Sequence, residues 1–339
     1  MRRSWVDRGD IDAREFEAVF ASASLFPGPT STQVAMWVGW RQRGLRGSLV
    51  AAALFISPAV VLMTLFAMGL STNSTWSHWI LRGATGAAWI LPAVVITACW
   101  ALVPTTMKPL HRHITTEKKW FVWWALLAGV LEQFQFVNPV VIIVGAGLVM
   151  VIIRQRVSGP LAGWLLTSGS TAFAGLALKV GLLSFGGGFV IVPILRADAV
   201  TTHHWMSEQV FVATVALGQL TPGPVFSTVA AIGYFADGVR GALVGALLAF
   251  APSFVLVNVA STHLTRLRAT PAAQAFLSGA LPASLGLIAG TAPLFMRAIS
   301  SWIGAAAALV GLFAIGSRRV TAPLVLLLGA GLGLLVIHT

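Results

Sequence analysis

The sequence predicts an all-α membrane protein that crosses the bilayer several times and consists of two homologous halves. Three observations support this prediction. Only 9% of the 339 residues are charged and 57% are hydrophobic, whereas soluble domains carry roughly 25% charged residues. Long apolar runs recur along the chain, and runs of about 20 apolar residues are typical of membrane-spanning helices. Finally, the second part of the chain repeats the motifs of the first.

The repeat is clearest around two Pro-Gly-Pro (PGP) motifs. FPGPTSTQVAMWVGW (residues 26–40) parallels TPGPVFSTVAAIGYF (residues 221–235). At one constant offset, the matched pairs that follow are Gly44 with Gly238, Gly47 with Gly241, and Pro58 with Pro252. Near the ends of the repeats, NPVVIIVGAGLVMVI and APLVLLLGAGLGLLVI share the sequence GAGL. We therefore predict an N-terminal half over residues 1–157 and a C-terminal half over residues 158–339.

The apolar runs place the membrane spans of each half. In the first half, spans are expected over residues 47–70, 80–103, 120–136 and 137–153. In the second half, we expect a crossing over residues 165–195, a hairpin over 207–236, and spans over 241–260, 273–297, 299–316 and 320–338. If each PGP block is a re-entrant hairpin, the main Lys and Arg clusters share one face, which the positive-inside rule makes cytoplasmic. The two halves are then inverted relative to each other, as in many secondary transporters.

One segment of the second half has no counterpart in the first. Residues 160–204 contain KVGLLSFGGGFVIVPIL, whereas the chain starts at the equivalent of the loop that follows such a helix. The sequence therefore predicts that the first helix of the N-terminal half is missing, either because the protein is shortened or because Met1 is not its natural start. It also predicts that only the second PGP motif has a glycine-rich helix beside it.

A helix cannot run through a PGP motif. Pro27 keeps the residue before it out of helical geometry, Gly28 can adopt backbone angles that other residues avoid, and Pro29 suits the start of a new helix. The new helix begins with free N–H groups, expected from about Thr30 to Gln33, and such a helix start attracts anions. The predicted ligands at the first motif are Gly28, Thr30, Ser31, Thr32 and Gln33. A thinner set at the second motif consists of Gln219, Gly223, Ser227 and Thr228.

Broken backbone at membrane depth must be buried in protein or line a wet cavity. Matched breaks in two halves therefore indicate a transport site, and the alternative is a tight turn in a loop at the membrane surface. Lys179 lies in an apolar stretch, where it could provide a counter-charge for an anion or extend to the membrane interface. Gly186, Gly187 and Gly188 could present N–H groups to a ligand or allow close helix packing.

The sequence contains no nucleophile paired with a base, no phosphate-binding loop and no metal-binding motif. We therefore expect no enzymatic activity, no cofactor and no metal site. The formal net charge of +12 would suggest nucleic-acid binding in a soluble protein. Here the basic residues lie in short loops between spans, as expected of cytoplasmic loops, so no nucleic-acid partner is predicted.

These motifs resemble the chromate ion transporter family. The resemblance rests on PGPTSTQVAMWVGW, KVGLLSFGGGFVIVPIL, GQLTPGPV and IGYFADGVRGALVG, and it extends over nearly the whole chain. It implies a bacterial inner-membrane protein that exports chromate, with sulfate as a chemically similar oxyanion. The chain departs from the family pattern in two ways: the usual first helix with an FGGP-type motif is absent, and Ala23 and Ser24 precede the first PGP where Gln is common. Gln219 keeps that residue in the second half.

The leading hypothesis is an oxyanion transporter that works by alternating access, with a divalent anion between the two PGP motifs. The predicted partners are chromate or sulfate and the lipid bilayer, with a homodimer left open. One alternative is a truncated, non-transporting paralogue or partner subunit. Another is a membrane-embedded enzyme acting on a polyanionic lipid, which the scarcity of intramembrane acidic residues disfavours. The sequence separates neither chromate from sulfate nor proton coupling from transport driven by the membrane potential.

Overall fold

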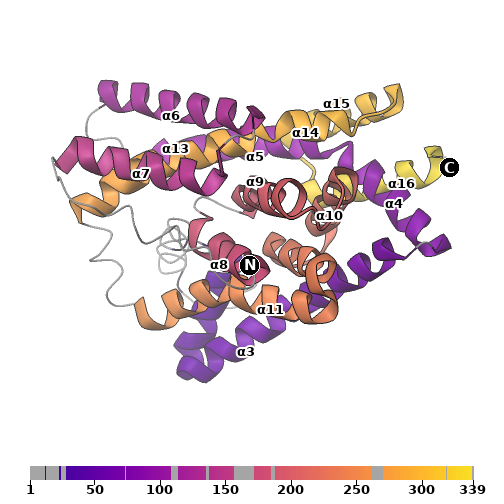
Figure 1. Ribbon diagram of the computed structural model, residues 1–339, viewed down its shortest axis with the longest axis horizontal. Helices are drawn as coiled ribbons and strands as arrows, with labels where there is room; N and C mark the ends of the chain where they lie inside the picture. The colour runs from indigo at the N-terminus through magenta and orange to yellow at the C-terminus, as the bar shows by residue number, and fades with distance from the viewer. Residues whose placement is uncertain are drawn as a thin grey trace.

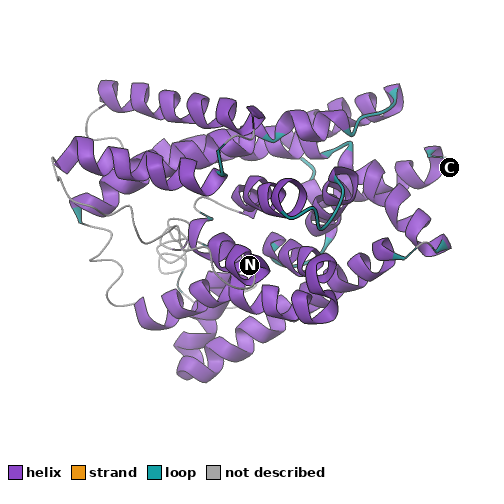
Figure 2. Cartoon of the chain, viewed as in Figure 1, coloured by secondary structure: helices purple, strands orange, loops and turns teal. Residues whose placement is uncertain are grey.

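The computed structural model describes residues 12, 23, 28–72, 74–107, 114–134, 137–155, 172–184, 188–260, 270–317 and 319–337. Within these residues the regular structure is helical, without strands (Figure 2). Three continuous helical stretches are long and apolar enough to cross a membrane: Thr30–Ser71, Val225–Val259 and Pro271–Arg297. A bent helix pair and several shorter apolar helices accompany them. The predicted all-α fold with several apolar spans is confirmed.

The helices of the first half follow the predicted spans. They are α3 (Thr30–Ser71), α4 (Thr75–Ala88), α5 (Leu91–Met107), α6 (Ile114–Phe134) and α7 (Pro139–Gln155). The predicted span over residues 80–103 is divided between α4 and α5, which bend by 44° at the break between them.

The second half contains more short elements. They are α8 (Ala172–Leu183), η3 (Gly188–Val190), α9 (Ile191–Arg196), η4 (Ala197–Thr202), α10 (Glu208–Leu220), η5 (Val225–Ser227), α11 (Thr228–Ala260), α13 (Pro271–Gly290), α14 (Ala292–Arg297), α15 (Trp302–Gly316) and α16 (Ala322–Val336).

The chain changes direction between α8 and α9. Lys179 Nζ lies 3.4 Å from Asp198 Oδ2, although a straight helix with a rise of 1.5 Å per residue would separate the two Cα atoms by roughly 28 Å. That separation is far beyond the combined reach of the two side chains. The predicted single crossing over residues 165–195 is therefore wrong, because the Gly-rich sequence permits a reversal as readily as a continuous span.

Each half contains the same hairpin after its PGP motif. α3 is interrupted at Arg43 (φ −141°, ψ 26°) and Gly44 (φ 58°, ψ −143°). α11 is interrupted at Asp237 (φ −153°, ψ 36°) and Gly238 (φ 58°, ψ −150°). The second conformation of each pair is one that glycine adopts without strain. Because all four angles nearly coincide, the sequence repeat is also a repeat of backbone structure.

The long limbs of α3 and α11, which follow these breaks, pack side by side in the lower part of Figure 1. Asn258 Nδ2, near the end of the α11 limb, donates a hydrogen bond of 3.0 Å to Ser48 Oγ, near the start of the α3 limb. Ala67, near the end of α3, shares a hydrophobic cluster with Ala242, near the start of the α11 limb. The two matched helices therefore run antiparallel, as an inverted repeat requires.

The later helices of each half pack against the other half. α6 and α7 contact α13, whereas α15 contacts α5 and α16 contacts α4. α4 and α5 follow α3 in the first half just as α13 follows α11 in the second half. In each half, therefore, the last two helices pack against the helices that follow the broken helix of the other half. The halves predicted over residues 1–157 and 158–339 are thus interlocked rather than separately packed.

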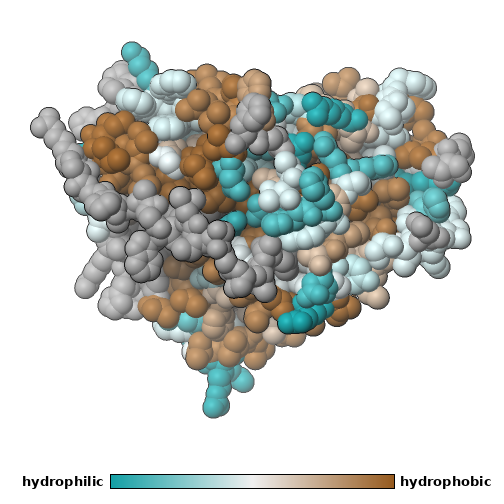
Figure 3. Space-filling model, viewed as in Figure 1, coloured by the Kyte–Doolittle hydropathy of each residue, from teal (hydrophilic) through white to brown (hydrophobic). Residues whose placement is uncertain are grey.

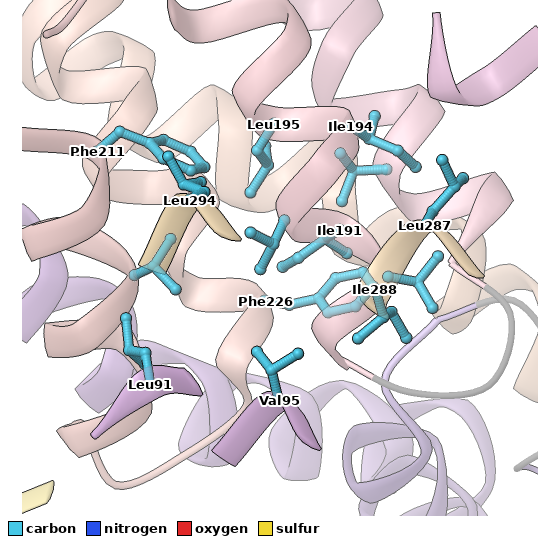
Figure 4. Packing of buried hydrophobic residues seen from close by; sticks show 14 of the residues in the cluster. Leu91, Val95, Ile191, Ile194, Leu195, Phe211, Phe226, Leu287, Ile288 and Leu294 are labelled. Atoms are coloured by element: carbon cyan, nitrogen blue, oxygen red, sulfur yellow. The ribbon is translucent and has the colours of Figure 1, made fainter. Parts of the chain in front are cut away.

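The main hydrophobic core includes residues that directly follow the second PGP motif. Phe226 of η5 is completely buried, and Figure 4 shows its ring next to Ile191 of α9 and Ile288 of α13. In contrast, large apolar side chains such as Leu54 and Phe313 are 71% and 80% exposed. Exposed apolar side chains on long helices are expected where lipid replaces water.

Candidate functional site

The first PGP motif has the geometry that the sequence predicts. Gly28 has φ +111°, Pro29 is extended (φ −73°, ψ 112°), and α3 begins directly after it. The N–H groups of Thr32 and Gln33 donate to the Pro29 carbonyl oxygen, each at 3.0 Å. In the described structure, this leaves the N–H groups of Thr30 and Ser31 as the free donors. The predicted set, Thr30 to Gln33, therefore loses the N–H groups of Thr32 and Gln33.

The second PGP motif has the same break with a tighter helix start. Gly223 has φ +136° and Pro224 is extended (φ −75°, ψ 132°). One 3₁₀ turn, η5, precedes α11, and the N–H group of Ser227 donates to the Pro224 carbonyl oxygen at 2.9 Å. The hydroxyl of Thr228 donates to the first carbonyl of η5 at 2.7 Å. Thr228 Oγ1 is therefore already engaged within its own helix.

Each motif packs against the long helix of the other half. A Cβ atom on Gly28 would overlap Ser253 Oγ of α11, and one on Gly223 would lie 2.7 Å from Ala59 Cβ of α3. Ser253 and Ala59 directly follow the matched prolines of the two halves. The amide of Gln33 also donates to Ser253 Oγ, at 3.4 Å. Each motif therefore contacts the equivalent position on the long helix of the other half, as expected for two segments related by a two-fold axis.

Buried polar atoms at both motifs lack a hydrogen-bond partner among the described residues, among them Thr32 Oγ1, Ser227 Oγ and Gln219 Nε2. Thr32 and Ser227 are both 0% exposed, and each is the third residue after the second proline of its motif. A buried polar group without a partner costs about 1–3 kcal/mol and calls for an explanation such as an absent ligand. Both hydroxyls lie at helix starts, which favour negative charge.

The described ends of the SFGGG segment, Ser184 and Gly188, each contact one motif. The Gly28 N–H group lies 3.1 Å from both the carbonyl oxygen and the Oγ atom of Ser184. A Cβ atom on Gly188 would lie 3.1 Å from Val225 Cβ in the second motif. Ser184 and Gly188 are four residues apart, a reach of at most about 14 Å. The expectation that only the second motif has the glycine-rich segment beside it is therefore wrong.

Lys179 has a different environment from the two motifs. Its ammonium group pairs with Asp198, and the side chains are 44% and 6% exposed respectively. Asp198 is therefore a buried acid whose negative charge Lys179 offsets. No group of three or more His, Cys, Asp or Glu residues that could hold a metal ion occurs among the described residues.

The remaining predicted ligands are placed as follows. Gly186 and Gly187 lie outside the described residues, and Thr30 and Ser31 are half-buried at the start of α3. Sequence reasoning missed two contacts of the first motif, Ser184 and Ser253. The available signals were the position of Ser184 directly before FGGG and that of Ser253 directly after a matched proline.

Two matched helix breaks inside an inverted helical repeat are features of multi-pass membrane transporters. Comparison with protein families is consistent with this class, because the chromate transporter family model matches residues 1–151 and 171–334. The chain therefore belongs to the chromate transporter family, and the predicted family and two-half organisation are confirmed.

Individual relatives cover most of the chain. A chromate transport protein of Cupriavidus metallidurans is 27% identical over 308 residues, which are 85% of this chain and 73% of the relative. A probable chromate transport protein of Synechococcus elongatus is 23% identical over 98% of this chain and 87% of its own length. An uncharacterized transporter of Methanocaldococcus jannaschii is 23% identical over 96% and 86%. No solved structure matches the chain.

Proposed function

We propose that the protein exports chromate across the bacterial inner membrane and binds the anion at the starts of α3 and α11. The observation that carries this proposal is the pair of matched, fully buried hydroxyls of Thr32 and Ser227 without partners in the described structure. Sulfate, another divalent tetrahedral oxyanion, is proposed as a competing substrate. The names of the chromate transport proteins among the relatives support the choice of chromate.

The proposed site binds an anion with neutral donors. Each helix start contributes about half a positive charge, and a hydrogen bond to a charged group contributes about 1.5–3 kcal/mol. Two hydroxyls and two helix starts can therefore replace part of the hydration shell of a dianion. A site without a fixed positive charge also releases the anion more readily, as transport requires.

The exchanged packing of the motifs supports alternating access as the proposed mechanism. Gly28 is seated on α11 and Gly223 on α3, so each anion-binding tip moves with the helix of the opposite half. A rocking motion of one half against the other would then open the tips first to the cytoplasm and then to the outside. The SFGGG segment, whose described ends each contact one motif, is proposed to follow this movement.

Chromate flux in everted membrane vesicles tests the proposal. Export from the cell appears in such vesicles as accumulation of chromate, and excess sulfate should reduce it. Thr32→Val and Ser227→Ala should each lower chromate flux by about 10- to 100-fold, because each removes a hydrogen bond to a charged ligand.

Thr214→Val and Ser284→Ala are matched controls. Their buried hydroxyls donate to the Val210 and Ala280 carbonyl oxygens, each at 2.8 Å, and flux should remain near the wild-type value. Equal flux in all four variants would contradict the proposed site. Absence of chromate flux in the wild-type protein would contradict the proposed substrate.

A further inference from the structure

A groove of about 840 Å³ lies between the two limbs of the α3 hairpin. The limbs converge near their turn, where a Cβ atom on Gly39 or Gly47 would overlap the carbonyl oxygen of the other glycine. Apolar side chains also line the groove, including Val50 and Leu54, which are 58% and 71% exposed.

The turn end of this groove carries positive charge. Arg43 and Arg46 both line it and are exposed, and neither has an ion-pair partner in the described part of the chain. Figure 3 shows hydrophilic side chains projecting at the bottom of the view, below α3, beyond a hydrophobic surface. The groove therefore combines a cationic end with an apolar floor.

At the matched turn of the second half, the charges of the two equivalent residues cancel. Asp237 stands at the position of Arg43, and Arg240 stands at the position of Arg46. Arg240 Nε lies 3.9 Å from Asp237 Oδ2, so this pair is electrically neutral. The same backbone turn thus presents two arginines without an ion-pair partner among the described residues in one half, and an ion pair in the other. This difference points to a ligand specific to the first turn.

We propose that the α3 groove binds a phospholipid with an anionic headgroup. Its phosphate would contact Arg43 and Arg46, since guanidinium groups bind phosphate in a bidentate manner and basic clusters beside a membrane span attract anionic lipids. One acyl chain would occupy the apolar part of the groove along Val50 and Leu54. The site is separate from the proposed anion site, because its floor is apolar and it opens on the exposed surface of α3.

Native mass spectrometry of the purified full chain tests the proposal, with phosphatidylglycerol and phosphatidylcholine of identical acyl chains as probes. Wild-type protein should retain phosphatidylglycerol in preference to phosphatidylcholine. The double variant Arg43→Gln/Arg46→Gln should bind phosphatidylglycerol roughly 30-fold more weakly, because each arginine near the membrane surface contributes about 1 kcal/mol. Arg240→Gln, at the matched turn, should leave its affinity unchanged.

A second variant separates the acyl chain from the charge. Val50→Trp fills the groove at an exposed position and keeps both arginines, so it should also weaken phosphatidylglycerol binding. Equal retention of the two lipids by wild-type protein would overturn the proposal, as would undiminished binding to Arg43→Gln/Arg46→Gln. Absence of any retained lipid would indicate that another part of the chain covers the groove, and would overturn it too. None of these readouts depends on anion transport.

Discussion

Replacing Thr32 by Val should make the protein more stable and at the same time less able to bind its substrate. Thr32 is 0% exposed, and its hydroxyl has no partner among the described residues. Valine has nearly the same shape, so the change removes a buried group whose lost hydrogen bonds cost about 1–3 kcal/mol. We expect a gain of about 1 kcal/mol without substrate, which corresponds to a rise in Tm of roughly 2 °C for a protein of this size. Ser227→Ala should act in the same direction, reduced by the small cavity that it leaves.

Thermal unfolding with and without chromate measures both effects. A ligand at 100 times its Kd stabilises the folded state by about 2.7 kcal/mol, so chromate should raise the Tm of the wild-type protein clearly. In Thr32→Val this increase should largely disappear, whereas the control Thr214→Val should keep it. A Thr32→Val variant that is less stable than wild type without anion would refute the reasoning, because its hydroxyl would then be bonded in the folded protein. A full chromate-induced shift in this variant would refute it equally.

Two further predictions concern the fold. In a cysteine-free background, Ser48→Cys should form a disulfide cross-link with Asn258→Cys but not with Ala242→Cys. Gel mobility after oxidation measures the cross-link. A cross-link to Ala242→Cys alone would exclude the antiparallel packing of α3 and α11. Lys179→Met should lower the Tm, because Asp198 is only 6% exposed and loses its partner at a cost of about 1–3 kcal/mol, and adding Asp198→Asn should recover most of the loss. If the double variant recovers its Tm but shows no chromate flux, Lys179 acts on the anion as well. Normal flux in the double variant would limit Lys179 to a structural role.

Much of the architecture is predictable from the sequence because it depends on local chemistry and on the repeat. The helix start after Pro29 follows from the restricted backbone of proline. The antiparallel packing of α3 and α11 agrees with the predicted inversion, although the charge argument for it counted residues 165–195 as one crossing. The aligned Gly44 and Gly238 correctly marked equivalent positions. Their shared backbone conformation was not predicted, since a glycine in a helix-like sequence indicates a break, a close contact or neither.

The errors arise where the outcome depends on packing between distant segments. The sequence KVGLLSFGGG fits a continuous span and a reversal equally well, and the pairing of Lys179 with Asp198 identifies the reversal. Ser184 and Ser253 were missed as neighbours of Gly28 because they are 156 and 225 positions away along the chain (184 − 28 and 253 − 28). Their contacts arise from the interlocking of the two halves, which no local pattern encodes.

The position of a bound oxyanion tests the central claim most directly. Anomalous X-ray scattering from chromium, measured on crystals grown with chromate, locates the anion without assumptions about residue roles. Our account predicts a peak between the starts of α3 and α11, within hydrogen-bonding distance of the hydroxyls of Thr32 and Ser227 and beside the SFGGG segment. A peak elsewhere, at Lys179 or in the α3 groove, with none at the two helix starts, would contradict it.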